Sequence, residues 1–197
     1  MSEFRPRTTP PDPSDLRWIN TSYGGFNRCI VINDATGLTI PNCTGYVHGR
    51  WMEVSGSTSC PLSVSNAANY YGYTADGMER GSEPRLGAVI CFSTGQGGQP
   101  GHVAIVEEIV DADTIITSDS NYGAEYFVMR TRHRSMGWNW WAGSDLVFQG
   151  FIYNPDAGGM SRRTLLLMMA AKKKRKEEEE NGKTVRLQQY TGTLRLH

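Results

Sequence analysis

The sequence predicts an α+β fold in which amino-terminal helices pack on an antiparallel β-sheet. Three observations favour this fold. Helical periodicity is confined to the first part of the chain, runs rich in β-branched and aromatic residues follow it, and turn residues separate several of these runs. The chain has 197 residues, of which 39% are hydrophobic, so it is long enough for a folded domain and too apolar to be wholly disordered.

The clearest helix signal covers residues 43–54. Its apolar residues recur at spacings of three and four positions, which places them on one face of a helix. Residues 41–42 supply a start signal and residues 55–57, Ser-Gly-Ser, an end signal. A second, short helix with a serine cap is predicted within residues 63–70.

The strand signals follow a glycine-rich link. Residues 111–113 and 121–123 carry turn chemistry, so they are expected to connect neighbouring strands as hairpins. The five predicted strands are residues 87–92, 102–110, 114–118, 125–132 and 148–153.

Composition divides the chain into three parts. Residues 1–17 form a proline-rich arm, residues 18–155 the folded body, and residues 156–197 a charged tail. The basic and acidic runs of the tail predict a solvated helix, with a docking segment for a partner as the alternative. Residues 184–196 are compatible with an added hairpin.

Several functional classes are disfavoured. No apolar run approaches the roughly 18 residues of a membrane span. The net charge is zero, with a mildly acidic body and a basic tail, so nucleic-acid binding is not expected of the body. No Cys-x-x-Cys pair exists and the histidines are scattered, so no metal or cofactor is predicted. The amino terminus has no signal-peptide pattern, which predicts a chain made in the cytoplasm with reduced thiols.

Cys43 is the one cysteine with an electrostatic reason to react. It is predicted in the first turn of a helix, where unpaired N–H groups and the helix dipole lower the pKa of a thiol. Cys29 and Cys91 lie in apolar runs, and Cys60 precedes a proline in a loop. The alternative for Cys43 is a small core residue.

His102 is the best candidate for a base beside this thiol. It follows a glycine-rich loop and opens the strongest strand, which would present the imidazole at the rim of a cleft. His48 lies five residues after Cys43 and projects to a different helix face, and His133 sits among arginines as a surface residue would. The alternative for His102 is a buried, hydrogen-bonded strand histidine.

A group that orients the imidazole is suggested by strand alternation. Asp119 and Asn121 are two residues apart and share a strand face. If residues 111–113 form a hairpin turn, Asp119 comes close to His102, where a carboxylate or amide could hold the required tautomer. The alternative is a local Asx cap before the next turn.

A cluster of tryptophans marks the segment before the last strand. Trp138, Trp140 and Trp141 could stack on sugar rings of a substrate. The alternative is a packing role in the core or at its rim, since large aromatic side chains commonly serve packing first.

Three ordered motifs resemble the CHAP family of cysteine, histidine-dependent amidohydrolases/peptidases. They are Asn-Cys-Thr-Gly-Tyr-Val at residues 42–47, Gly-His-Val-Ala-Ile-Val-Glu at residues 101–107 and Ser-Asp-Ser-Asn-Tyr at residues 118–122. The likeness covers about residues 18–155 and is greatest to lytic enzymes of phages that infect Gram-positive bacteria.

The resemblance implies a papain-like (NlpC/P60-like) fold and hydrolysis of an amide bond in peptidoglycan. It makes Cys43 the nucleophile and His102 the general base, with Asp119 at a position that is commonly Glu and Asn121 as the amide two residues later. Either of these two could orient the imidazole, because Asp is a methylene shorter than Glu. Asn42 stands where the family often has Gln, whose side chain would hold the oxyanion with the backbone N–H of Cys43.

The expected activity is that of an N-acetylmuramoyl-L-alanine amidase or of an endopeptidase that cuts the peptide cross-link. The resemblance implies an endolysin or virion-associated lysin that acts on the wall after release from the host cytoplasm or from the particle, with peptidoglycan as its partner and no metal or cofactor. The alternative is a tail-associated structural protein of a phage, whose CHAP domain is accessory and whose basic tail docks to a partner.

Overall fold

The computed structural model describes most of the amino-terminal four fifths of the chain. The described residues are 4–12, 14–19, 31–33, 38–95, 100–121 and 125–158. The chain divides into two units, Met1–Gly159 and Met160–His197, and the second lies outside the described residues, as do the helix and hairpin predicted for the tail.

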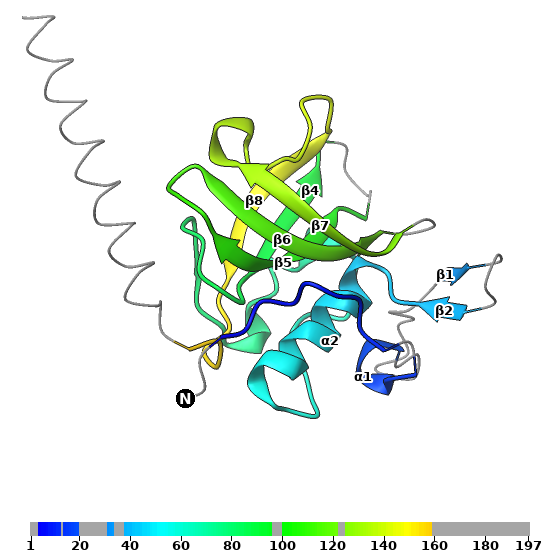
Figure 1. Ribbon diagram of the computed structural model, residues 1–197. Helices are drawn as coiled ribbons and strands as arrows, with labels where there is room; N and C mark the ends of the chain where they lie inside the picture. The colour runs from blue at the N-terminus through cyan, green and yellow to red at the C-terminus, as the bar shows by residue number, and fades with distance from the viewer. Residues whose placement is uncertain are drawn as a thin grey trace, which may run out of the picture. The chain divides into compact units, whose positions relative to one another are not determined.

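A six-stranded antiparallel sheet forms the centre of the first unit (Figure 1). Its strand order is β3-β8-β4-β5-β6-β7, so the chain from β4 to β7 is a meander and β8 returns to pair with β4. Its strands are β3 (Arg80–Gly81), β4 (Val89–Thr94), β5 (His102–Ile109), β6 (Thr114–Asn121), β7 (Glu125–His133) and β8 (Leu146–Ile152).

The five strands predicted from the sequence are all present, with shifted ends. The largest shift is in β6, which continues three residues beyond its predicted end to Asn121, because β7 provides hydrogen-bonding partners along that whole length. The first predicted strand begins two residues late, at Val89, since Gly87 adopts a left-handed conformation with φ 72° that ends the preceding turn.

One long helix, α2 (Cys43–Ser55), packs against the sheet. Asn42 caps its first turn, and Gly56 ends it in the left-handed conformation, with φ 64°. Its apolar residues join β4, β5 and β8 in one core cluster, and a second cluster lies between the strands and the tryptophan segment. The arrangement confirms the predicted α+β fold.

The second helix predicted from the sequence is a short 3-10 helix rather than an α-helix. Residues 63–70 form only the 3-10 helix η2 (Ala67–Asn69), whose first residue follows Asn66 without a side-chain cap. Several other short elements are not predicted from the sequence. They are α1 (Leu16–Ile19), β1 (Val31–Asn33), β2 (Leu38–Ile40), β3, η3 (Thr74–Asp76) and η4 (Arg134–Met136), of which β1 and β2 form an antiparallel pair. Elements of three or four residues carry too little periodicity to be recognised.

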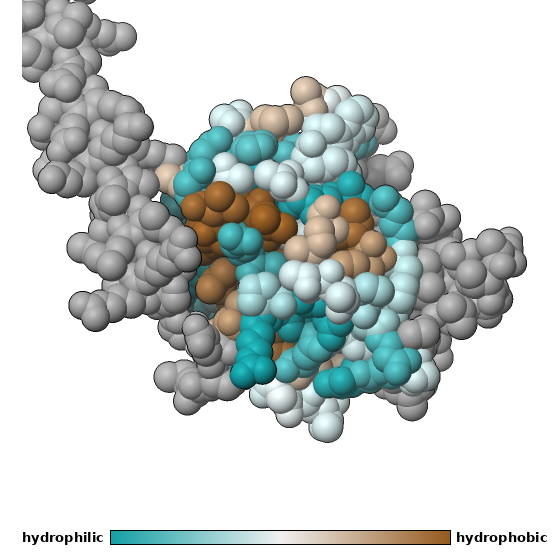
Figure 2. Space-filling model, viewed as in Figure 1, coloured by the Kyte–Doolittle hydropathy of each residue, from teal (hydrophilic) through white to brown (hydrophobic). Residues whose placement is uncertain are grey.

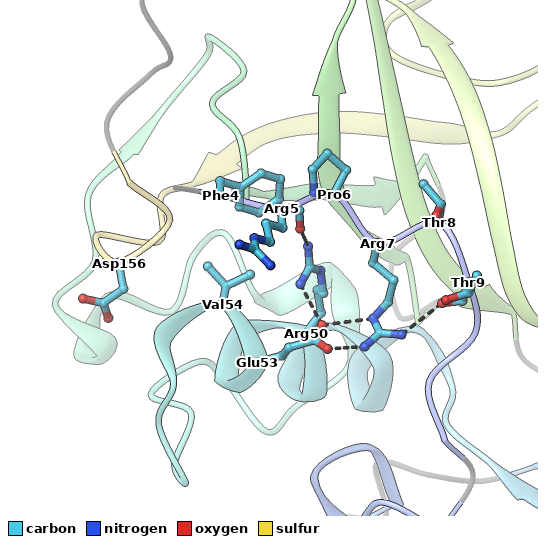
Figure 3. Close-up of a pocket in the computed structure, with 10 residues that line it drawn as sticks. All are labelled: Phe4, Arg5, Pro6, Arg7, Thr8, Thr9, Arg50, Glu53, Val54 and Asp156. Carbon is cyan, nitrogen blue, oxygen red and sulfur yellow. Dashed lines mark hydrogen bonds and ion pairs between the residues drawn. The ribbon is translucent and has the colours of Figure 1, made fainter. Parts of the chain in front are cut away.

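The proline-rich arm lies against α2 in residues 4–12 (Figure 1). Arg7 binds the carboxylate of Glu53, and its backbone N–H donates to Glu107 over 2.8 Å. Arg50 donates to the same Glu107 carboxylate over 2.9 and 2.8 Å, and to Glu53 over 2.7 Å. Figure 3 shows these arginines beside a pocket of about 490 Å³ between the arm and α2. The arm is thus held by charge-assisted hydrogen bonds, and the Tyr126 hydroxyl also donates to the carbonyl of Pro11.

Glu107 is the centre of this network. Its side chain is completely buried, and Ser118 also donates to it over 2.6 Å. In Figure 2, polar residues surround the apolar areas of the visible face, whereas this carboxylate is hidden beneath the surface. A buried carboxylate is tolerated here because four hydrogen bonds replace its hydration.

We expect Glu107→Gln to lower the free energy of unfolding by about 3 kcal/mol, because it leaves the buried guanidinium of Arg50 without its main counter-ion. Urea unfolding followed by circular dichroism measures the change. Glu108→Gln, at the exposed neighbouring position, is the matched control and should change stability by less than about 0.5 kcal/mol. Equal effects of the two variants would contradict the structural role of this network.

Candidate active site

Cys43 is the first residue of α2, and its side chain is partly exposed. This position puts the side chain at the positive, amino-terminal end of the helix dipole. Two other cysteines are buried: burial raises the pKa of the Cys91 thiol well above its usual range, and Cys60 is part of the main core cluster. Cys29 lies outside the described residues. The structure therefore leaves Cys43 as the reactive candidate among the described cysteines.

His102 opens β5 directly after Gly101, whose backbone is in the left-handed conformation. The preceding residue, Gly101, has φ 69°, and a side chain there would lie 2.4 Å from the carbonyl oxygen of Phe92. Only glycine fits both the conformation and the close approach to β4. Gly101 therefore fixes the backbone at the start of the strand that carries the imidazole.

The side chains of His102 and Asp119 are in contact. Nε2 of the imidazole lies 2.5 Å from Oδ2 of the carboxylate, and both side chains are buried. The pairing of β5 with β6 places Ile105 opposite Ser118, so Asp119 lies one position further along β6 on the face of the sheet that carries His102. This is the proximity that the hairpin at residues 111–113 predicts.

The protonation of His102 is set by its two neighbours. Burial alone would lower the pKa of the imidazole, but the charge of Asp119 and hydrogen bonds with Asp119 and Cys43 together raise this pKa to about 9. The pKa of Asp119 is lowered despite its burial, because His102, Arg132 and Arg130 favour the carboxylate. With Nε2 directed at Asp119, Nδ1 is the nitrogen left for the thiol of Cys43. His102 therefore carries a proton at neutral pH and lies beside the thiol of Cys43.

Two arginines of β7 face the same carboxylate. Nη2 of Arg132 lies 3.2 Å from Oδ2 of Asp119, and Nε of Arg130 lies 3.5 Å from Oδ1. The sequence analysis treated these arginines only as the surroundings of His133. Strand alternation was the signal that could have found them, since Arg130 lies opposite Thr117 and therefore shares a face with Asp119 and Arg132.

The three tryptophans have different environments. Trp138 is only 2% exposed and packs on Phe148 and Phe151, so it is a core residue and is not available to a substrate. Trp140 packs edge-on against His102, with 5.7 Å between the ring centroids. Trp141 is 53% exposed. Packing, the alternative weighed above, therefore describes Trp138, whereas the other two remain candidates for substrate contact.

Asn42 uses one end of its amide as the cap of α2. Its Oδ1 accepts from the backbone N–H of Gly45 over 2.8 Å and from the hydroxyl of Thr44 over 2.7 Å. Since the carbonyl end is engaged by the helix, the Nδ2 end remains as a donor next to Cys43. The side chain of Asn121 lies outside the described part of the structure, so its predicted role stays a prediction.

The other described histidines serve elsewhere. His48 is buried, and its Nε2 is within hydrogen-bonding distance of the Ser63 carbonyl and the Tyr70 hydroxyl, at 2.9 and 3.0 Å. His133 is partly exposed, with Nδ1 3.7 Å from Asp113. Within the described ranges, no group of three potential metal-ligating side chains occurs, and no helix is long and apolar enough to cross a membrane.

The part of the chain that carries this geometry matches a known protein family. The family model for the CHAP domain matches residues 33–121, which include Cys43, His102 and Asp119. The match confirms the resemblance carried by the three motifs, and the helix-on-sheet arrangement agrees with its papain-like fold. A search of curated protein sequences found no match.

Two solved structures show a limited likeness. An N-acetylmuramoyl-L-alanine amidase from Staphylococcus aureus is 27% identical with a TM-score of 0.41, and the alignment covers 57% of this chain and 30% of the amidase. The structure of Ly7917 is 18% identical with a TM-score of 0.40, over 71% of this chain and 61% of that protein. The chain thus spans less than two thirds of either protein. At TM-scores this low, neither likeness says anything about the chemistry of this chain.

Proposed function

Because residues 33–121 of this chain are a CHAP domain, a domain of cysteine, histidine-dependent amidohydrolases, we propose that the protein hydrolyses an amide bond of bacterial peptidoglycan with Cys43 as its nucleophile. The observation that carries the proposal is the continuous contact from the thiol at the start of α2 through His102 to the buried carboxylate of Asp119. This arrangement supplies a nucleophile, a base and an orienting group.

The proposed reaction proceeds by acyl transfer. The thiolate of Cys43 forms a bond to the carbonyl carbon, and the carbonyl electron pair moves to oxygen. The imidazolium of His102 then gives its proton to the departing nitrogen as the carbon–nitrogen bond breaks, which releases an amine and leaves a thioester. A water molecule, deprotonated by the now neutral imidazole, attacks the thioester and restores the thiol. Asp119 keeps the imidazole oriented through both steps.

Asn42 is proposed to hold the oxyanion together with the backbone N–H of Cys43. We expect Asn42→Ser to lower kcat by about 10²–10³-fold, because serine caps a helix as well as asparagine but carries no amide donor. Steady-state kinetics on solubilised peptidoglycan fragments measure the change. Asn42→Ala, which removes cap and donor together, should add a loss of stability of about 1 kcal/mol. If the Asn42→Ser variant kept the wild-type kcat, Asn42 would serve only as the helix cap.

The substrate contacts are proposed to involve Trp140 and Trp141. Trp140 lies beside the imidazole and Trp141 exposes half of its side chain, so both could contact a sugar or a peptide that reaches Cys43. The two proposed substrates differ in the bond that is cut. An amidase separates the sugar from the peptide, whereas an endopeptidase cuts within the peptide.

Mass spectrometry of the fragments released from purified wall tests the function. Free lactyl carboxylates on the sugar together with new alanine amino termini would identify an amidase, and new termini inside the peptide an endopeptidase. If purified chain releases no more fragments than its Cys43→Ala variant, the hydrolase proposal fails.

We further propose that the enzyme works as a phage lysin, made in the host cytoplasm and acting on the wall after release, or carried by the virion. The support is the likeness of the three motifs to phage lytic enzymes. The alternative, a tail-associated structural protein with an accessory CHAP domain, predicts a chain that copurifies with particles and does not open walls.

A further inference from the structure

Arg132 is an arginine in an unusual place. Its side chain is completely buried near the end of β7, where its guanidinium has no access to water. Nε donates to the hydroxyl of Thr117 over 2.8 Å, Nη1 to the carbonyl of Trp138 over 3.3 Å, and Nη2 to Asp119 over 3.2 Å. The guanidinium thus connects β6, the segment after β7 and the carboxylate that binds His102.

The same guanidinium also contacts two aromatic rings. Its central carbon lies 5.0 Å from the ring centroid of Phe92 and 4.7 Å from that of Trp140. Trp140 in turn packs edge-on against His102. Besides Cys43, the imidazole therefore contacts a carboxylate at Nε2 and an indole against its ring, and Arg132 contacts both of these groups.

Burying a whole arginine side chain costs folding free energy, so its presence here indicates a role. A hydrophobic side chain could fill the same space between two aromatic rings at lower cost, but it would leave Oδ2 of Asp119 with the imidazole as its only hydrogen-bonding partner. Arg130 does not replace this contact, because its Nε lies 3.5 Å from the other oxygen and neither atom forms a hydrogen bond.

We propose that Arg132 is a positioning residue for the reaction: its rigid fork holds the carboxylate of Asp119 and the indole of Trp140, and through them orients the imidazole of His102 toward Cys43. This inference rests on the proposed roles of Cys43, His102 and Asp119. The planar fork matters as well as the charge, since a single ammonium group cannot bind Thr117, Trp138 and Asp119 while lying between two rings.

The experiment measures the reactivity of Cys43 directly and needs no substrate. Intact protein is treated with iodoacetamide between about pH 5 and 9, and modification of the Cys43 peptide is followed by mass spectrometry. An imidazole oriented toward Cys43 acts as a base for its thiol, so wild-type protein should react rapidly at pH 6. In Arg132→Gln we expect this rate to fall at least about tenfold, because both the orientation and a nearby positive charge are lost.

A matched control separates this effect from the general loss of an arginine. Arg80→Gln removes a largely buried guanidinium that binds Asp76 and the Tyr71 carbonyl, away from His102. It should leave the pH profile of Cys43 alkylation unchanged. Equal profiles in folded Arg132→Gln and wild-type protein would overturn the proposal, as would an Arg80→Gln profile shifted as much as that of Arg132→Gln.

Two further variants keep the test decisive if Arg132→Gln does not fold. Thr117→Val preserves volume and charge but removes the acceptor of Nε, and it should slow alkylation at pH 6 in the same direction. Arg132→Lys retains a positive charge without the fork, so it should not restore the wild-type profile. Wild-type alkylation in either variant would show that the fork does not position the imidazole.

The outcome is independent of the substrate. If the chain opened no cell wall but Cys43 alkylation still depended on Arg132, the proposed function would fail and the positioning role would stand. If wall hydrolysis required Cys43 while Arg132 variants kept the wild-type alkylation profile, the positioning role would fail alone.

Discussion

Replacing Cys43 with alanine should lower the rate of wall hydrolysis by about 10⁵–10⁶-fold, to the background of the assay. The expected loss is this large because no other described group can form the acyl bond: the remaining described cysteines are buried, and His102 without a thiol has only water to activate. The free energy of unfolding should change by less than about 1 kcal/mol, since Cys43 is partly exposed at a helix end. Turbidity loss of purified wall and urea unfolding measure the two quantities.

Cys91→Ala is the control for this prediction. Cys91 is completely buried in the main core cluster, so the substitution removes a sulfur from a packed site and should cost about 1–2 kcal/mol of stability. Hydrolysis per folded molecule should stay near the wild-type rate. The opposite pattern, with an active Cys43→Ala variant and an inactive folded Cys91→Ala variant, would show that the nucleophile is not on α2.

The parts of the fold that the sequence predicted are those with regular patterns. The alternation of β-branched residues identifies β5 and β6 as strands, and the acidic turn between them predicts their hairpin. That hairpin is sufficient to place Asp119 near His102, because antiparallel pairing fixes which residues of the two strands are neighbours. The helix at Cys43 was likewise evident from its spacing and its asparagine cap.

The remaining parts depend on contacts between distant segments. Nothing in the local sequence of the arm indicates that the N–H of Arg7 will bind Glu107, a hundred positions away. Similarly, a run of arginines before a tryptophan segment has the composition of an exposed surface. Arg132 becomes a core residue because distant parts of the chain, among them Phe92 on β4 and Trp140, pack against its guanidinium. Burial of a charged group is set by the complete fold and has no local signature.

The pH dependence of the reaction should reveal the charge on Asp119. In the wild-type protein, the pKa of His102 is raised to about 9 by Asp119 and Cys43, against the effect of burial. Below this pH the imidazole carries the proton that the leaving nitrogen needs, and above it the proton is lost. We therefore expect kcat/KM to fall above about pH 9.

Asp119→Asn should move this alkaline limit down, to about the ordinary histidine value of 6.5 or below. The amide can still accept a hydrogen bond from Nε2, but it has no charge to offset burial, and it leaves the guanidinium groups of Arg130 and Arg132 opposite a neutral group, which further disfavours an imidazolium. At neutral pH we expect kcat to fall by about 10²–10⁴-fold. The measurement is kcat/KM from about pH 5 to 10 on a soluble wall fragment.

Asp113→Asn is the matched control, because Asp113 lies 3.7 Å from His133 and both side chains are partly exposed. Its alkaline limit should coincide with that of the wild-type protein. If Asp119→Asn keeps a limit near pH 9, the proton lost there does not belong to an imidazole held by this carboxylate, and the orienting role would pass to another group, of which Asn121 on the same strand is the first to substitute.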